Sequence, residues 1–258
     1  MKINSCPIFI VSLPQSNRRY DINKKLSKYS FQYEDAIYGK ILGEQYLQEL
    51  NNHQWIKNNY RRDLTFGEVG CALSHRNIYK KIIDQNIPWA IIFEDDISIK
   101  HPFYDVLVNN IDKFNPNDLY ILGAQEGLAC NDYVILSNKN SINLNGFIKF
   151  NKAIDSERYI YRTAAYLISK KVAENILNFT EKKFCLADDW SCFKKHNLFN
   201  ELYMSDFISH PVDLNHQSFL ELERSSKIKK NWKMRYPLIY KILKKVYINY
   251  RILKNLGK

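Results

Sequence analysis

Residues 89–100, with the sequence WAIIFEDDISIK, end an apolar run on three consecutive carboxylates. A short apolar run of this kind is typical of a buried strand. In open α/β sheets, ligands bind beyond the carboxyl ends of the strands, so Glu94, Asp95 and Asp96 are predicted to face a binding crevice. Three adjacent carboxylates repel one another, and a hard divalent cation such as Mn²⁺ or Mg²⁺ would relieve that repulsion. The alternative is a capped turn whose acidic side chains form surface salt bridges.

Strands and helices alternate through the first half of the chain. A length of 258 residues is enough for one sizeable core. Thr65 and Glu68 have the spacing of a capping box, which predicts the start of a strong helix. The pattern as a whole predicts an α/β/α sandwich around a mixed, mostly parallel sheet. Strands are predicted at 7–13, 89–93, 118–124, 132–137 and 147–150, helices at 15–29, at 43–53 and from 65 onward, a strand feeding a helix at 164–179, and a loop at 57–63.

The net charge of +11 is confined to the C-terminal tail. Residues 227–258 carry eleven Lys and Arg and no acid; removing these from the 38 Lys and Arg leaves 27, which equals the 27 Asp and Glu. A helix is predicted beyond Pro237. Its apolar face holds Ile239, Leu243, Val246, Tyr250 and Leu253, and its basic face holds Lys241, Lys244, Lys245, Arg251 and Lys254.

A basic amphipathic helix of this kind is typical of a segment that lies in a membrane interface and is attracted to anionic lipid. We therefore divide the chain into a main domain, 1–222, and a basic tail, 223–258. The alternative for the tail is packing on the domain or on a second copy. RNA binding is disfavoured because no nucleic-acid motif accompanies the basic residues.

The cysteines and the apolar runs indicate where the protein acts. The five cysteines are an odd number and contain no CxxC pair, which favours reduced thiols in a cytosolic protein. The N-terminal apolar run is too short for a signal peptide, and no segment approaches the roughly 18 apolar residues of a membrane span. A cytoplasmic protein is expected.

Five blocks occur in a characteristic order: FIVSLPQSNRRYD, LTFGEVGCALSHRNIYKKI, WAIIFEDDISI, DLYILGA and RTAAYLISKKVAENIL. Together they closely resemble glycosyltransferase family 25 over about residues 7–220. Phe93, where an aliphatic residue is usual, is a conservative departure. Bacterial members build lipooligosaccharide, and a typical one is a β-1,4-galactosyltransferase. The resemblance implies a GT-A-like fold, a UDP-sugar donor, inverting transfer of a hexose to a lipid-linked saccharide, and a location at the inner face of the cytoplasmic membrane.

The resemblance also implies roles for the acidic residues. Asp96 would bind Mn²⁺ on the donor diphosphate, while Glu94 and Asp95 would face the ribose or the sugar. Transfer needs a Lewis acid for the departing UDP and a base for the acceptor hydroxyl. Asp188 and Asp189, in CLADDWSCF, are the candidates for that base, with Asp188 favoured. Each of the two could instead be a helix N-cap or a first-turn acid.

The remaining candidates are less specific. A guanidinium suits a diphosphate or stacks on uracil, and a C-terminal histidine completes the metal shell in some GT-A enzymes. The alternatives are a solvated helix face for the arginines and a hydrogen bond within the helix for His75. The candidates are Ser12 and Leu13 for backbone contacts with the uracil base, Arg18 and Arg19 for the diphosphate or uracil, Ser74 and His75 for the donor, and His210 and His216 as metal ligands.

Two other functions stay open at this point. A Mg²⁺-dependent phosphohydrolase could use the same acidic cluster, although the Thr and Lys set that it needs is not found. A non-catalytic basic module that binds membrane or RNA is the second alternative. Such a module would ignore UDP and Mn²⁺, whereas a transferase would bind UDP more tightly with the metal present.

Overall fold

A computed structural model describes residues 6–128, 130–144, 148–210 and 237–255. Its centre is a single nine-stranded sheet. The strands are β1 (Ile8–Ser12), β2 (Phe31–Asp35), β3 (Trp89–Glu94), β4 (Ser98–Ile99), β5 (Leu119–Gly123), β6 (Leu136–Asn143), β7 (Lys149–Ala153), β8 (Ala165–Ser169) and β9 (Leu202–Ser209).

The sheet is mixed. Its strand order is β2-β1-β3-β8-β5-β9-β7-β6, and β4 pairs with β9. The strands β2, β1, β3, β5, β9 and β6 run in one direction, whereas β8, β7 and β4 run in the other. The predicted mixed sheet, in which most strands run in one direction, is therefore confirmed.

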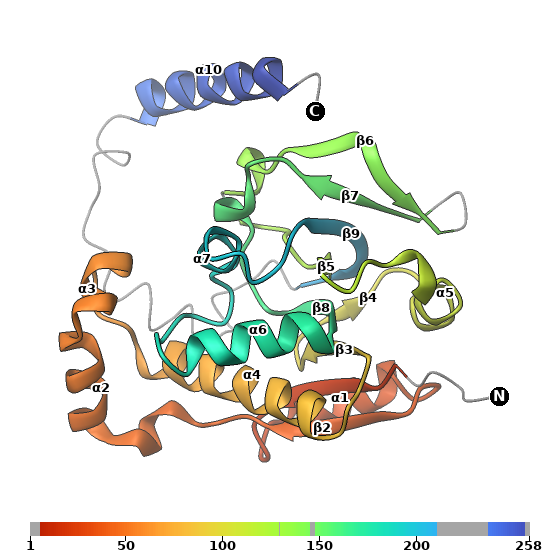
Figure 1. The fold of residues 1–258 in the computed structure, drawn as a ribbon, viewed down its shortest axis with the longest axis vertical. Coiled ribbons are helices and arrows are strands. Elements are labelled where there is room, and N and C mark those ends of the chain that lie inside the picture. Colours follow the sequence, from red (N-terminus) through yellow and green to blue (C-terminus); the bar gives the residue numbers. More distant parts are fainter. Residues whose placement is uncertain (1–5, 129, 145–147, 211–236, 256–258) are drawn as a thin grey trace.

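Helices cover both faces of this sheet (Figure 1). Alternate residues of β1 point to opposite faces, so Phe9 and Val11 pack with the longer helices while Ile8 and Ile10 pack on the other side. The predicted α/β/α layering is confirmed. The helices α4 (Phe66–Asp84), α6 (Lys170–Thr180) and α7 (Trp190–Lys195) lie on the first face, and α1 (Arg18–Lys25) and α5 (Tyr104–Val108) lie on the second.

Several elements differ from the sequence prediction. Residues 57–60 of the predicted loop at 57–63 are helical. They belong to α3 (Gln54–Tyr60), which follows α2 (Gly43–Asn52). The imidazole of His53 caps α3 by accepting a hydrogen bond from the backbone N–H of Trp55. The strand predicted at 132–137 begins later, at Leu136. Neither β2 nor β9 was expected, because both mix apolar with charged or polar residues.

The predicted tail helix is present as α10 (Pro237–Asn255). Arg251 was expected on an open basic face, and this expectation is wrong. Its side chain is only 8% exposed, and it donates hydrogen bonds to the carbonyl oxygens of Tyr133 and Asp155 at 2.9 and 2.6 Å. These bonds hold α10 against the domain. The predicted boundary between 222 and 223 falls within 211–236, outside the described residues.

The described helices were also compared with the requirements of a membrane span. Within the described ranges, none of them combines the length and the apolar character that crossing a bilayer demands.

Candidate active site

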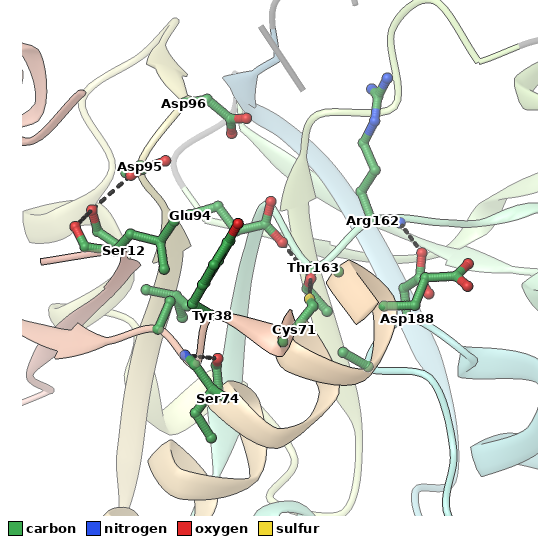
Figure 2. Close-up of a pocket in the computed structure, with 18 of the residues that line it drawn as sticks. Ser12, Tyr38, Cys71, Ser74, Glu94, Asp95, Asp96, Arg162, Thr163 and Asp188 are labelled. Atoms are coloured by element: carbon green, nitrogen blue, oxygen red, sulfur yellow. Dashed lines mark hydrogen bonds between the residues drawn. The ribbon is translucent and has the colours of Figure 1, made fainter. Parts of the chain in front are cut away.

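A pocket of about 600 Å³ opens where β1 and β3 end (Figure 2). These strands are parallel neighbours with Val11 opposite Glu94, so the residues that follow them meet at one edge. The antiparallel strand β8 begins at the same edge, and β9 ends there. The sequence-predicted residues that line the pocket are Ser12, Leu13, Arg18, Ser74, Glu94, Asp95, Asp96, Asp188 and His210.

Asp95 joins the acidic triplet to the loop after β1. Its Oδ2 accepts hydrogen bonds from the hydroxyls of Ser12 and Ser16 at 2.6 and 2.8 Å. Its Oδ1 accepts one from Arg18 Nη1 at 3.2 Å. Because both oxygens are bonded, the carboxylate anchors this loop. The predicted contact of Asp95 with the donor stays a prediction.

Asp96 and His210 lie together although they are far apart in the chain. The Nε2 atom of His210 is 3.3 Å from Oδ2 of Asp96, and Nη1 of Arg18 is 3.0 Å from the same oxygen. Burial alone would raise the pKa of Asp96, but the hydrogen bond and charge of His210 and the charge of Arg18 outweigh it, so this pKa lies below its usual value. The Asp96 carboxylate is therefore ionised.

This pair suits a hard divalent cation. The Oδ1 atom of Asp96 is buried and has no hydrogen-bond partner among the described residues. A carboxylate oxygen and an imidazole nitrogen 3.3 Å apart can bind the same ion. The third predicted ligand, His216, lies outside the described residues.

Glu94 lies at the floor of the pocket. Its Oε1 accepts a short hydrogen bond from the hydroxyl of Thr163 and lies 3.9 Å from Nε2 of His75. Burial, followed by the negative charge of Asp96, raises the pKa of Glu94 to about 7. Burial also lowers the pKa of His75 to about 3, so its imidazole is neutral. His75 lies behind the pocket wall, and its predicted contact with the donor stays a prediction.

The start of α4 shapes one wall of the pocket. The predicted capping box between Thr65 and Glu68 is confirmed. Gly70 allows close backbone packing, because a Cβ at this position would come within 2.4 Å of the carbonyl oxygen of Ile37. The hydroxyl of Ser74 accepts a hydrogen bond from the Ile37 N–H at 2.8 Å and donates one to the Gly70 carbonyl at 2.6 Å. This block therefore holds the pocket-lining segment around Ile37 on the helix.

The two aspartates before α7 have different surroundings. Asp189 is the N-cap of α7: its Oδ1 accepts a hydrogen bond from the Cys192 N–H at 3.1 Å, and its Oδ2 accepts one from the Tyr60 hydroxyl at 2.9 Å. Burial is the main cause that raises the pKa of Asp189. Asp188 instead lines the pocket, and its Oδ2 accepts a hydrogen bond from the Arg162 N–H at 3.0 Å (Figure 2).

The sequence of the chain matches a known protein family. The sequence model of glycosyltransferase family 25, described as an LPS biosynthesis protein family, matches residues 5–191. The chain belongs to glycosyltransferase family 25. The match includes the acidic triplet, the start of α4 and both aspartates before α7.

The family 25 relatives carry different names. The chain is 27% identical to the lipooligosaccharide biosynthesis protein lic2B of Haemophilus influenzae over 93% of this chain and 94% of that protein. It is 35% identical to procollagen galactosyltransferase 1-A of Xenopus laevis over 37% of this chain, and it spans only 17% of the length of that relative. It is also 31% identical to the inactive glycosyltransferase 25 family member 3 of Mus musculus, over 37% of this chain and 17% of that protein.

One predicted residue of this family 25 chain, Arg19, supports the pocket from outside. Arg19 is not among the residues that line it. Its guanidinium lies 4.3 Å above the ring of Tyr33, and its Nη2 donates a hydrogen bond to the carbonyl oxygen of Ser12 at 2.9 Å. Arg19 therefore holds the end of β1 from behind.

Tyr38, Arg162 and Thr163 are among the residues that line the pocket of this family 25 chain but were not predicted from the sequence. Tyr38 is 50% exposed there, and Thr163 binds Glu94. Arg162 has a φ of 69°, and its Nη1 donates hydrogen bonds to the carbonyl oxygens of residues 124 and 126, both at 2.9 Å. The family block RTAAYLIS contains Arg162 and Thr163, but its apolar periodicity predicted only a strand.

Proposed function

We propose that the protein is a metal-dependent inverting glycosyltransferase. It moves a hexose, galactose in a β-1,4 linkage, from a UDP-sugar to a lipooligosaccharide or lipopolysaccharide acceptor. The observation that carries this proposal is that the Asp96–His210 pair and the carboxylate of Asp188 belong to one pocket. Family membership supports glycosyl transfer, and the names of two relatives support the acceptor class and the sugar.

Asp96 and His210 would hold the cation, because they offer the oxygen and nitrogen ligands described above. Bound Mn²⁺ or Mg²⁺ would supply a Lewis acid that neutralises the departing UDP. Arg18 would contact the diphosphate with its guanidinium. Ser12 and Leu13 line the same pocket and would offer backbone groups to the uracil base.

Asp188 would act as the base. It would accept the proton of the acceptor hydroxyl while that oxygen attacks C1 of the sugar and the bond between C1 and the UDP oxygen breaks. The hydrogen bond from the Arg162 N–H orients the carboxylate for this role. Inversion needs one base and no covalent intermediate, so a second nearby carboxylate is not required as a nucleophile.

A panel of UDP-sugars tests the activity directly. With Mn²⁺ present, we expect UDP release from UDP-galactose to exceed that from UDP-glucose and UDP-N-acetylglucosamine, and EDTA to abolish it because the departing diphosphate loses its counter-charge. UDP formation is followed by a coupled assay, with heat-inactivated protein as the control. If no donor is cleaved and UDP does not bind with Mn²⁺, the chain resembles its inactive relative in function.

We also propose that α10 brings the pocket to the inner face of the cytoplasmic membrane. Its residue Arg251 packs on the domain, which leaves another side of the helix outward. Lys245 and Lys254 are exposed on the same helix, and basic residues near an anionic surface contribute about 1 kcal/mol each. The apolar side chains on the outward side are Ile242, Leu243, Val246, Tyr250 and Leu253, all between 53% and 67% exposed.

Vesicle flotation tests the role of α10. The protein is expected to float with phosphatidylglycerol vesicles and much less with phosphatidylcholine vesicles. Val246→Glu should weaken this binding by at least about tenfold, because inserting a valine side chain contributes about 1.5–3 kcal/mol and 1.36 kcal/mol corresponds to a factor of ten. Ile41→Glu is the matched control, since Ile41 is 74% exposed outside α10. Equal binding to both vesicle types, or an equal effect of both variants, would contradict the proposal.

A further inference from the structure

A second group of potential metal ligands lies beside the pocket. The Sγ atom of Cys71, one ring nitrogen of His75 and one carboxylate oxygen of Glu94 all lie within 4.8 Å of one another. Cys71 and His75 are four residues apart on α4, so their side chains lie side by side on one face of the helix. Glu94 reaches them from the end of β3, and Figure 2 shows its carboxylate near Cys71 and Thr163.

The histidine of this group is oriented for binding. Its Nδ1 is 2.7 Å from the Tyr166 hydroxyl, which is 3.0 Å from the hydroxyl of Tyr79. With the proton on Nδ1, this hydrogen bond leaves the lone pair of Nε2 directed toward Glu94. Nε2 has no hydrogen-bond partner among the described residues, the His75 side chain is 1% exposed, and the 3.9 Å to Glu94 Oε1 is too long for a hydrogen bond. Metal-binding histidines are usually held through their second nitrogen in this way.

The other two ligands are open to the pocket. Cys71 and Glu94 are among its lining residues. The hydroxyl of Thr163 bonds Oε1 of Glu94 and lies 3.7 Å from Sγ of Cys71, so it links the two. An ion at this position would therefore have three protein ligands and one coordination position facing the pocket. That pattern is typical of zinc sites that keep an open position.

We propose that Cys71, His75 and Glu94 bind one zinc-like transition-metal ion, at a site separate from Asp96 and His210. A thiolate, an imidazole and a carboxylate together favour Zn²⁺, whereas Mn²⁺ and Mg²⁺ prefer oxygen ligands. Zinc bonds of about 2.0–2.3 Å require ligand atoms roughly 3.5 Å apart. The three ligand atoms now lie within 4.8 Å of one another. Side-chain rotations that move the Cys71 and Glu94 ligand atoms by about an ångström would bring them to the spacing of zinc ligands.

Cobalt is the probe for this site, because a Co²⁺–thiolate bond gives a charge-transfer band in the near ultraviolet. The full-length protein, first treated with a chelator, is titrated with Co²⁺. We expect a band that saturates at one equivalent and disappears when Zn²⁺ is added. Cys71→Ser should abolish the band, and His75→Gln should weaken Co²⁺ binding by at least about tenfold through loss of a ligand.

Two variants serve as matched controls. Cys192→Ser tests a pair of thiols outside the proposed site, since Sγ of Cys192 is 3.9 Å from Sγ of Cys185. Asp96→Asn tests the proposed hard-cation site. The band should persist in both. Circular dichroism checks the fold of every variant, and if His75→Gln does not fold, the comparison of Cys71→Ser with Cys192→Ser decides.

The proposal is overturned if the wild-type protein shows no band, if Cys71→Ser retains it, or if Cys192→Ser loses it. None of these measurements depends on glycosyl transfer. A protein that shows the band but transfers no sugar would support this site and contradict the proposed function, whereas a protein that transfers sugar without the band would do the reverse.

Discussion

Asp96→Asn is expected to reduce glycosyl transfer by about a thousandfold. Neutralising the departing diphosphate with a metal contributes several kcal/mol, and each 1.36 kcal/mol corresponds to a factor of ten in rate. Asparagine has the size of aspartate and can still accept the hydrogen bond from Arg18, so the fold should be preserved. The rate of UDP formation with UDP-galactose, Mn²⁺ and acceptor measures the effect.

Binding measurements separate a loss of metal from a loss of structure. In titration calorimetry, Mn²⁺ should tighten UDP binding to the wild-type protein but not to Asp96→Asn, while UDP binding without metal should be similar in both. Asp84→Asn, at the exposed end of α4, is the matched control and should transfer sugar normally. A fully active Asp96→Asn protein would remove the basis for metal-assisted transfer at this site.

Asp188→Asn is expected to lower kcat, whereas Asp189→Ala is expected to lower stability. Loss of a general base lowers kcat by about 10²–10⁴-fold, and asparagine at position 188 can still accept the Arg162 N–H, so KM and stability should change little. Loss of the N-cap at position 189 should instead lower the free energy of unfolding by about 0.5–2 kcal/mol, with kcat within about threefold of wild type. Steady-state kinetics and urea denaturation, carried out on both variants, measure the two effects.

Each variant serves as a control for the other, because the two aspartates are adjacent in the chain. The reverse result, a large kcat loss only in Asp189→Ala with unchanged stability, would make Asp189 the base. Small kcat losses in both would mean that another group deprotonates the acceptor.

Regular elements with strong periodicity were predictable from the sequence. The apolar run before Glu94 forms β3, and the Thr65–Glu68 spacing marks the start of α4, because both depend on residues close together in the chain. The strands β2 and β9 were missed. They form because neighbouring strands supply backbone partners, and the mixture of apolar with polar or charged residues in β2 and β9 does not reveal those partners.

The site was partly predictable for the same reason. The acidic triplet is contiguous, so its position after a strand was sufficient to locate the pocket. His210 was a less specific candidate, and only the arrangement of β9 brings it within 3.3 Å of Asp96. The cluster of Cys71, His75 and Glu94 was not predicted, because it needs both the helical spacing of α4 and the end of β3.

The layered α/β fold, the capped helix α4 and the place of the acidic residues at a strand end follow from periodicity and local hydrogen bonding, so they could be predicted from the sequence. Which neighbour of a pair lies in the pocket depends on the folded chain: Asp188 lines it and Asp189 caps α7, while Arg18 lines it and Arg19 packs on Tyr33. The burial of Arg251 also depends on the folded chain. The physical reason is that a side chain's environment is set by contacts with residues distant in the chain, and adjacent identical residues have no sequence signal that distinguishes them.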